Sequence, residues 1–147
     1  MRLYLLTVIL LFGALGLNAQ ALKKPAKSKA DKKGVASYYH DKFEGRKTAT
    51  GDVFENDRFT AASNKLKLGT YVKVTNLKNG NIAYVQVNDR MAPTNHRLID
   101  LASVAAEMLD FIENGLAKVK VEIVPEKEGK MGILAESQIR KIMKTEL

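Results

Sequence analysis

The clearest candidate for acid–base chemistry is a carboxylate at the end of an expected strand. Residues 84–90 alternate apolar and polar side chains and end on the acid Asp89, followed by the base Arg90. This alternation predicts a half-buried strand. A strand that holds one carboxylate at the edge of a β-structure can position a proton donor. Another role stays open, because a strand-end aspartate also caps backbone amides in the following turn. Neighbouring strand residues face opposite sides, so Arg90 either pairs with Asp89 or points inward and holds a loop.

Few other residues offer a competing chemistry. Asp52 follows Gly51, so it fits a turn as well as a site, and Asp100 fits a buried hydrogen-bonding position or a helix start. The two histidines, His40 and His96, are isolated in the sequence, and their spacing does not predict a zinc site. The sequence contains no phosphate-binding loop and no nucleophile elbow. We therefore expect neither a metal nor a cofactor.

Short strands are expected to position these residues. Strand character appears in six segments, namely 34–39, 58–63, 71–77, 82–88, 97–101 and 118–123. Asn79-Gly80, between the third and fourth segments, is typical of a tight hairpin because both residues tolerate positive φ. The pattern predicts a mainly β fold, in which a small barrel carries one helix.

That helix is expected just after the fifth strand. An apolar stripe at helical spacing indicates it, and Asn114-Gly115 would end it. The stripe, which we interpret as core packing, consists of Leu101, Val104, Ala105, Met108, Leu109 and Ile112. From Pro125 the sequence becomes a charged tail over residues 125–147. Ile139, Ile142 and Met143 would share one face of a short helix there, and a loosely docked tail is the alternative.

The N-terminal segment predicts export. Arg2 precedes an apolar run of about 15 residues that ends at small residues, shorter than the roughly 20 residues of a membrane span. This is typical of a secretory signal peptide over residues 1–21, and a retained membrane anchor is the alternative. Residues 22–33 hold six lysines and one aspartate, which predicts a disordered linker. Most of the net charge of +8 lies there, so nucleic acid is not an expected partner.

The chain contains no cysteine. A disulfide framework is therefore excluded, and so is a lipid attached to a cysteine after the signal. Residues 22–147 are long enough for one domain with a hydrophobic core and too few for two, and we expect that domain to span residues 34–124. We expect this domain to be a monomer in the periplasm or cell envelope, with no membrane span after the signal is cleaved.

Several motifs in this domain resemble those of a known family. In chain order they are Gly34–Tyr39, Phe43–Phe54, Thr60–Ser63, Leu68–Leu77, Asn79-Gly80, Val87–Arg90 and Arg97–Leu101. Together they resemble the rare lipoprotein A family of peptidoglycan lytic transglycosylases. The resemblance covers residues 34 to about 124. It implies a six-stranded double-psi β-barrel with one or two short helices and a groove across one side. It also implies cleavage of glycan strands between N-acetylmuramic acid and N-acetylglucosamine, with a 1,6-anhydro end.

The resemblance further implies which residues act. The key carboxylate of the family falls on Asp89, and a second acidic position, usually Glu, falls on Asp52. The histidine that usually follows Thr-Ala-Ala falls on Ser63. We expect the catalytic residues to be Asp89 and Asp52. The residues expected to bind the glycan are Ser63, Arg90, Tyr39 and Asn88.

One carboxylate would be enough for this reaction, because the 6-hydroxyl of the sugar is the nucleophile in a transglycosylase. Asp89 would give a proton to the leaving oxygen and then take one from that hydroxyl. Partial burial, or Asp52 nearby, would help it hold the proton. Because Ser63 replaces the usual histidine, a non-catalytic wall-binding module that resembles expansins is the alternative function. A barrel that binds another glycan, or acts like an inhibitor, is a third interpretation.

Overall fold

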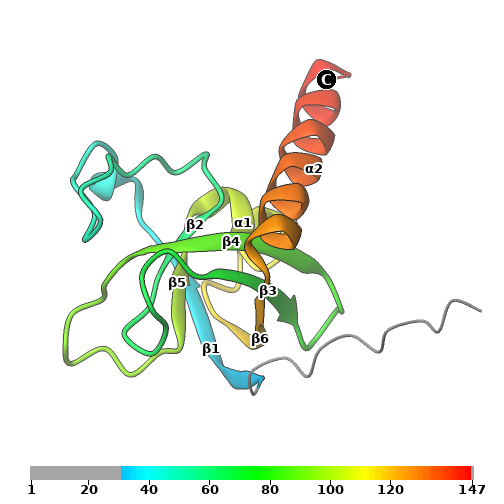
Figure 1. Cartoon of the computed structure of the whole chain (residues 1–147). Coiled ribbons are helices and arrows are strands. Elements are labelled where there is room, and N and C mark those ends of the chain that lie inside the picture. The colour runs from blue at the N-terminus through cyan, green and yellow to red at the C-terminus, as the bar shows by residue number, and fades with distance from the viewer. Residues whose placement is uncertain (1–30, 147) are drawn as a thin grey trace, which may run out of the picture.

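Six strands close into a barrel in the computed structural model, which describes residues 31–146. Around the barrel the strands follow the order β1–β5–β2–β4–β3–β6 (Figure 1). β1 pairs in parallel with β5, and β2 pairs in parallel with β4, whereas the other neighbours are antiparallel. The strands are β1 (Lys32–Tyr38), β2 (Thr60–Ala62), β3 (Tyr71–Asn76), β4 (Ile82–Asp89), β5 (Ile99–Leu101) and β6 (Ala117–Val124). This closed, mixed barrel confirms the predicted six-stranded double-psi fold.

The alternating strands bury one face each, as their sequence pattern predicted. Val72 and Val74 of β3 and Val85 and Val87 of β4 are fully buried in the barrel interior. β3 and β4 form the expected hairpin, in which Gly80 takes a φ of 78° and donates its N–H to the carbonyl of Asn76 at 2.8 Å. The hairpin fixes the register of β4, and the register of β4 decides where Asp89 ends up.

The helix after β5 is shorter than the sequence predicted. α1 (Ser103–Met108) begins after Leu101, which belongs to β5, and ends well before Asn114-Gly115. Asp110 adopts a left-handed φ of 55°, and Phe111 then turns into the core with 2% of its surface exposed. The left-handed residue breaks the helix, so the apolar stripe packs against the barrel from a helix and a turn instead of one long helix.

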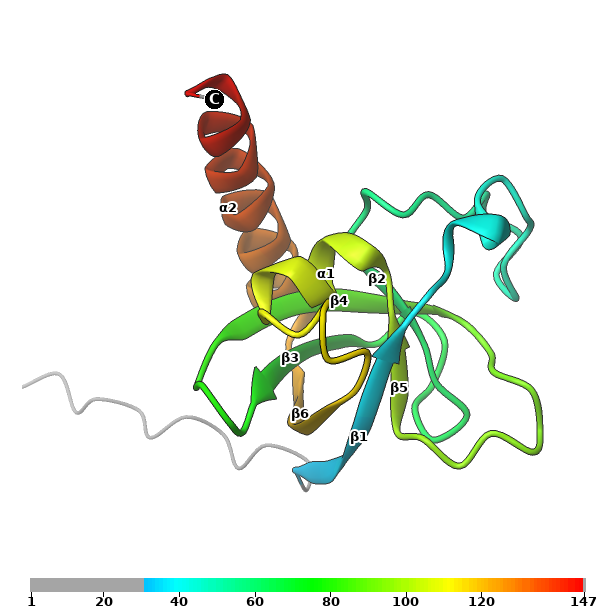
Figure 2. The same ribbon diagram turned by 180° about the vertical axis from the view of Figure 1, so that it is seen from behind.

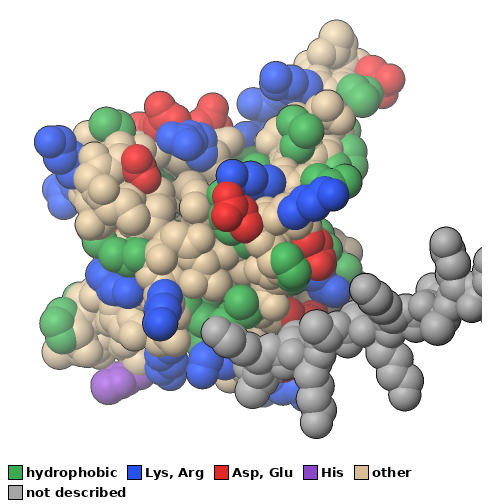
Figure 3. All heavy atoms as spheres, in the orientation of Figure 1, with side chains coloured by type: hydrophobic (Ala, Val, Ile, Leu, Met, Phe, Trp, Pro, Cys, Tyr) green, Lys and Arg blue, Asp and Glu red, His purple; other side chains and the backbone are tan. Residues whose placement is uncertain are grey.

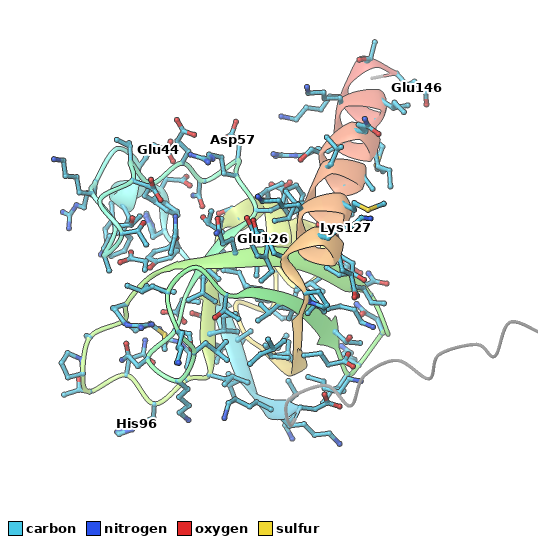
Figure 4. The ribbon with its side chains drawn as sticks, viewed as in Figure 1. Glu44, Asp57, His96, Glu126, Lys127 and Glu146 are labelled. Atoms are coloured by element: carbon cyan, nitrogen blue, oxygen red, sulfur yellow. The ribbon has the colours of Figure 1, made fainter. Side chains whose placement is uncertain are left out.

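The C-terminal segment forms a helix of 20 residues, α2 (Glu126–Thr145), which is longer than the short helix or loose tail that we expected. Its first half lies across β3 and β4. Gly129 meets the Tyr71 side chain and Gly132 meets the Tyr84 ring, so closely that a Cβ at either position would overlap the ring. Its second half projects away from the barrel (Figures 1 and 2), and Figure 4 labels Glu126 and Glu146 near its two ends. Ile139, Ile142 and Met143 are exposed there.

The predicted signal peptide and most of the predicted linker lie outside the described residues. Lys32 and Lys33, which the sequence placed in the linker, are the first residues of β1 and pair with Val121 and Lys120 of β6. Backbone pairing explains this, because both side chains stay exposed while their amides join the ladder. Among residues 31–146, no helix has the length and apolar character needed to cross a membrane.

Candidate active site

Asp89, the last residue of β4, lies in a groove of about 500 Å³. The groove runs between two loop segments that follow β1 and β4. In Figure 4, Glu44 and Asp57 mark the segment on one side of this end of β4, and His96 marks the tip of the loop on the other. The long strand therefore carries its terminal carboxylate from the barrel into the space between the two loops, as the sequence pattern suggested.

Three donors hold the Asp89 carboxylate. The backbone N–H groups of Ala49 and Arg90 both donate to Oδ1, at 2.9 and 2.8 Å. The hydroxyl of Tyr39 donates to Oδ2 at 2.9 Å. Asp89 therefore does accept a backbone amide from the turn that follows it, and it also faces the groove. The capping role and the groove position are compatible.

Tyr39 forms the aromatic wall beside that carboxylate. Its ring packs against Phe43 at a centroid distance of 5.5 Å and against Phe54 at 4.6 Å. Burial, together with the charge of Asp89 and the hydrogen bond to it, raises the pKa of the Tyr39 phenol far above its ordinary value. The phenol is thus a permanent hydrogen-bond donor in the groove.

Basic side chains surround this wall. Lys42 and Arg46 each place their cationic group over the Phe43 ring, 5.3 and 5.2 Å from its centroid. Lys47 also lines the groove. Figure 3 shows basic side chains on both lobes at the left of the molecule. The groove is therefore suited to a ligand that offers both a flat apolar face and negative or polar groups.

A second carboxylate in the groove, Asp100, is fully engaged within the protein. It is 9% exposed and accepts a hydrogen bond from Ser37 at 2.7 Å. Arg97 binds both of its oxygens, at 2.8 and 2.9 Å, and this pairing raises the pKa of the guanidinium. Asp100 has the buried hydrogen-bonding role that was one of the two expected from sequence, and it fixes the loop that forms the groove wall.

Asp52 is exposed and does not line this groove. Its carboxylate accepts the hydroxyl of Thr50 at 2.7 Å, and its backbone carbonyl accepts the N–H of Thr48 at 2.8 Å. The N–H of Thr50 in turn donates to the carbonyl of Asn88 at 3.2 Å. Asp52 thus shapes the short loop whose Ala49 amide reaches Asp89, which links the two acids through the loop.

Arg90 points away from the Asp89 carboxylate and holds a loop. Its guanidinium donates to the carbonyls of Ser63 and Leu66, the second at 2.7 Å. This is the inward-pointing alternative that the strand alternation left open. The Arg90 side chain lines the groove, but its guanidinium is hydrogen-bonded to backbone carbonyls.

Ser63 is completely buried. Its hydroxyl donates to the carbonyl of Leu98 at 2.8 Å and accepts the N–H of Lys65 at 3.1 Å. Both functions of the hydroxyl are therefore used inside the protein, and its position gives no support to the expected contact with a glycan. Asn88 is also buried, at 7% exposure, and it contributes to the site through its backbone carbonyl.

Sequence reasoning missed two parts of the site. The Ala49 amide carries no side-chain signal, although the Thr48–Asp52 run of small and polar residues was a recognisable turn. The contact of Phe43 with Lys42 and Arg46 was also missed. In the sequence, Phe43 stood out only as the start of a family motif. Among the described residues, no group of three or more histidines, cysteines or acids is arranged to hold a metal ion.

Comparison with known proteins gives a consistent picture. The family model for lytic transglycolases matches residues 31–121, which is more than half of the chain. The Endolytic peptidoglycan transglycosylase RlpA of Haemophilus influenzae is 42% identical over 116 residues, which make up 78% of this chain and 40% of that protein. The chain thus spans about two fifths of the length of the first curated relatives that it matches.

Two solved structures share the fold. The Streptomyces papain inhibitor superposes with a TM-score of 0.54 at 22% identity, covering 67% of this chain and 98% of that one. An expansin of Clavibacter michiganensis superposes with a TM-score of 0.53 at 22% identity, covering 66% of this chain and 52% of that one. At this identity, the likenesses show a common barrel architecture and leave the chemistry to be argued from the groove.

Proposed function

The chain belongs to the lytic transglycolase family, and on that premise we propose that it is an exported enzyme that cleaves the glycan strands of peptidoglycan. Asp89 is its acid and base. The bond cut joins N-acetylmuramic acid to N-acetylglucosamine, and the product ends in 1,6-anhydro-N-acetylmuramic acid. The name of the Haemophilus influenzae relative and its 42% sequence identity support this assignment. The observation that carries it is the carboxylate of Asp89, which lines the groove and is not paired with a basic side chain among the described residues.

The reaction needs one proton to leave Asp89 and one to return. A protonated Asp89 donates to the glycosidic oxygen as the bond from that oxygen to the anomeric carbon breaks. The 6-hydroxyl of the same muramic acid residue attacks the anomeric carbon and gives its proton to the Asp89 carboxylate. No water is consumed. A hydrolase of the usual type needs two free carboxylates, whereas the second carboxylate that lines this groove, Asp100, is bound at both oxygens by Arg97.

The rest of the groove would hold the glycan. Phe43 and Tyr39 offer ring faces to the apolar faces of sugar rings, while Lys42, Arg46 and Lys47 offer donors to carboxylate and carbonyl oxygens. Asp52 acts by holding the Thr48–Asp52 loop against Asp89. We place the enzyme in the periplasm or cell envelope, where its substrate is found.

The direct test is incubation of the purified protein with peptidoglycan, followed by mass spectrometry of the soluble products. Anhydro-muropeptides are expected from the wild type, and Asp89→Asn should reduce their rate of formation by at least about a hundredfold. The matched control is Asp57→Asn, an exposed acid of the neighbouring loop that does not line the groove. Absence of anhydro products from the wild type, or full activity in Asp89→Asn, would rule out this function.

A non-catalytic wall-binding role is the second candidate. It is favoured by one observation: Ser63, in the position where the family usually has a histidine, is buried and bonded within the protein. A binding module would pellet with peptidoglycan without creating new chain ends, and Asp89→Asn would leave the pelleted fraction unchanged. Failure to co-sediment with peptidoglycan would exclude this role.

A further inference from the structure

We propose that Tyr39 is a positioning residue of this site, whose phenol makes Oδ2 of Asp89 the oxygen that carries and returns the proton. The proposal rests on the function assigned to Asp89 above and extends it to one atom. It also replaces the sequence-based expectation that Tyr39 serves mainly to bind the glycan. The two roles predict different kinetics, so they can be separated.

The hydrogen bonds to Asp89 divide its two oxygens. Oδ1 accepts two backbone N–H groups, from Ala49 and Arg90, and these fill its two lone-pair directions. Oδ2 accepts only the Tyr39 hydroxyl, so one lone pair is left for a proton or for a substrate hydroxyl. The backbone therefore occupies one oxygen and Tyr39 orients the other, in a groove that both side chains line.

Tyr39 is itself rigidly held. Its backbone N–H donates to the carbonyl of Leu101 at 2.8 Å, and its carbonyl accepts the hydroxyl of Ser103 at 3.3 Å. Its ring contacts Phe43 and Phe54 on the groove wall. A phenol fixed in this way limits the rotation of the Asp89 carboxyl group, which a flexible donor such as lysine would not do.

The Tyr39 phenol keeps its own proton through the cycle. Burial and the neighbouring carboxylate raise its pKa, so it donates to Asp89 without becoming the acid. While Asp89 is ionised, the phenol stabilises the carboxylate. When Oδ2 is protonated, the phenol still occupies one side of that oxygen and directs the new O–H toward the open side. The proton passes only between Oδ2 and the glycan oxygens.

Other charges near Asp89 are directed elsewhere. The Arg90 guanidinium binds two carbonyls, and Arg97 binds Asp100 on β5. From the segment after β1, the basic groups that line the same groove are His40, Lys42, Arg46 and Lys47. None of the hydrogen bonds and ion pairs found among the described residues joins these groups to the Asp89 side chain. Tyr39 is thus the one side-chain donor to Asp89 among them, and its removal should be felt directly.

The test is Tyr39→Phe, which keeps the ring and removes the donor. Loss of this donor changes the surroundings of Oδ2, so the carboxyl carbon resonance of Asp89 should shift at a fixed pH in ¹³C-labelled protein, where it is assigned with Asp89→Asn. At the pH optimum, kcat should fall about tenfold while KM stays within about twofold.

Tyr84→Phe is the matched control. Tyr84 belongs to β4, the strand that ends at Asp89, but its hydroxyl donates to Glu128 of α2 at 3.4 Å and not to Asp89. The control substitution should change neither the Asp89 carboxyl resonance nor kcat. An unchanged Asp89 resonance in Tyr39→Phe overturns the proposal, and so does a higher KM with unchanged kcat, which would make Tyr39 a glycan contact. If the wild type forms no anhydro product but the Asp89 resonance shifts in Tyr39→Phe, the proposed enzyme function fails while the coupling of Tyr39 to Asp89 stands.

Discussion

Glu136 of α2 accepts the backbone N–H of Tyr84 in β4 with both carboxyl oxygens, at 2.8 and 3.1 Å. The reason lies in the barrel. The N–H of Gln86 in β4 donates to the carbonyl of Phe59, the residue just before β2. The N–H of Tyr84, two residues earlier in β4, points to the same side, but the pairing between β2 and β4 begins only at Gln86. Glu136 therefore satisfies an amide that the sheet leaves open, and it is 7% exposed in doing so. The helix is docked by a specific polar contact as well as by packing.

This contact predicts a pH-dependent stability. Burial raises the pKa of Glu136 from 4.5 to about 7 in the folded protein. The folded state therefore binds the proton more tightly than the unfolded state, so its contribution to stability is complete below about pH 4.5 and is lost as the pH rises through 7. The expected loss is roughly 3 kcal/mol of the free energy of unfolding between these limits, measured by urea titration at several pH values.

Glu136→Gln supplies the comparison for that measurement. Its amide oxygen can still accept the Tyr84 N–H, but the side chain no longer titrates. The loss of unfolding free energy between about pH 4.5 and pH 8 should therefore be smaller in this variant by roughly 3 kcal/mol. At pH 8 the variant should be the more stable protein. Equal slopes in the two proteins would mean that Glu136 ionises freely and that the helix contact is solvated.

A second prediction concerns the close approach of α2 to the barrel. A Cβ at Gly132 would overlap the Tyr84 side chain at Cγ, Cδ2 and Cβ. These atoms lie close to the backbone of β4, so they cannot move aside without moving the strand. Gly132→Ala gains about 1 kcal/mol in helix propensity but should lose more through overpacking, about 1 to 3 kcal/mol. The measurement is limited proteolysis with mass spectrometry, which should show faster cleavage within residues 126–145. Gln138→Ala, at an exposed position of the same helix, should not be cleaved faster.

The third prediction tests whether Arg90 is structural. Since its guanidinium holds the carbonyls of Ser63 and Leu66, Arg90→Ala should lower the free energy of unfolding by about 1 to 2 kcal/mol. Arg90→Lys should recover only part of this, because one ammonium group cannot reproduce the forked geometry. Chemical denaturation measures both. Arg58→Ala is the control, since that exposed side chain forms a single ion pair within residues 31–146, with Glu55, and its loss should change stability by less than about 0.5 kcal/mol. If Arg90→Ala proves as stable as Arg58→Ala, the loop does not depend on Arg90.

The strand pattern could be predicted because each strand has its own local signal. Alternation placed β3, β4 and β6, and Asn79-Gly80 placed the hairpin that sets the register of β4. The end of α1 could not be predicted in this way, because the apolar stripe continues past Met108 and only the left-handed Asp110 breaks it. The docking of α2 on the barrel was missed for a similar reason, because it depends on two glycines that meet Tyr71 and Tyr84 from another part of the chain.

In the site too, residues with a local sequence signal could be predicted, and residues that meet through long-range contacts could not. Asp89 could be found because its strand ends on it, and the family motif marked it as well. The partners of Asp89 could not be found, because Ala49 and Tyr39 reach it across 40 and 50 residues of sequence. Ser63 shows that a motif position does not fix a role. It stands where the family motif predicts a site residue, but its hydroxyl donates to the Leu98 carbonyl and accepts the Lys65 N–H. Strand alternation allowed Arg90 either to pair with Asp89 or to point inward. Its hydrogen bonds to the loop at 63–66 show that it points inward.

The last prediction separates two ways in which Asp52 could assist Asp89. If Asp52 acts through its loop, Asp52→Asn should keep activity within about threefold, since its amide oxygen still accepts the Thr50 hydroxyl. Asp52→Ala and Thr50→Val should each lower kcat about tenfold, because the Ala49 amide loses its support. Combining these two changes should cost little more than either one alone, since both break the same contact. The rates come from anhydro product formation, and hydrogen exchange of the Ala49 amide gives a readout that does not depend on activity. If Asp52→Asn is as inactive as Asp52→Ala while Ala49 stays protected, the negative charge of Asp52 acts on the reaction directly and the loop explanation is wrong.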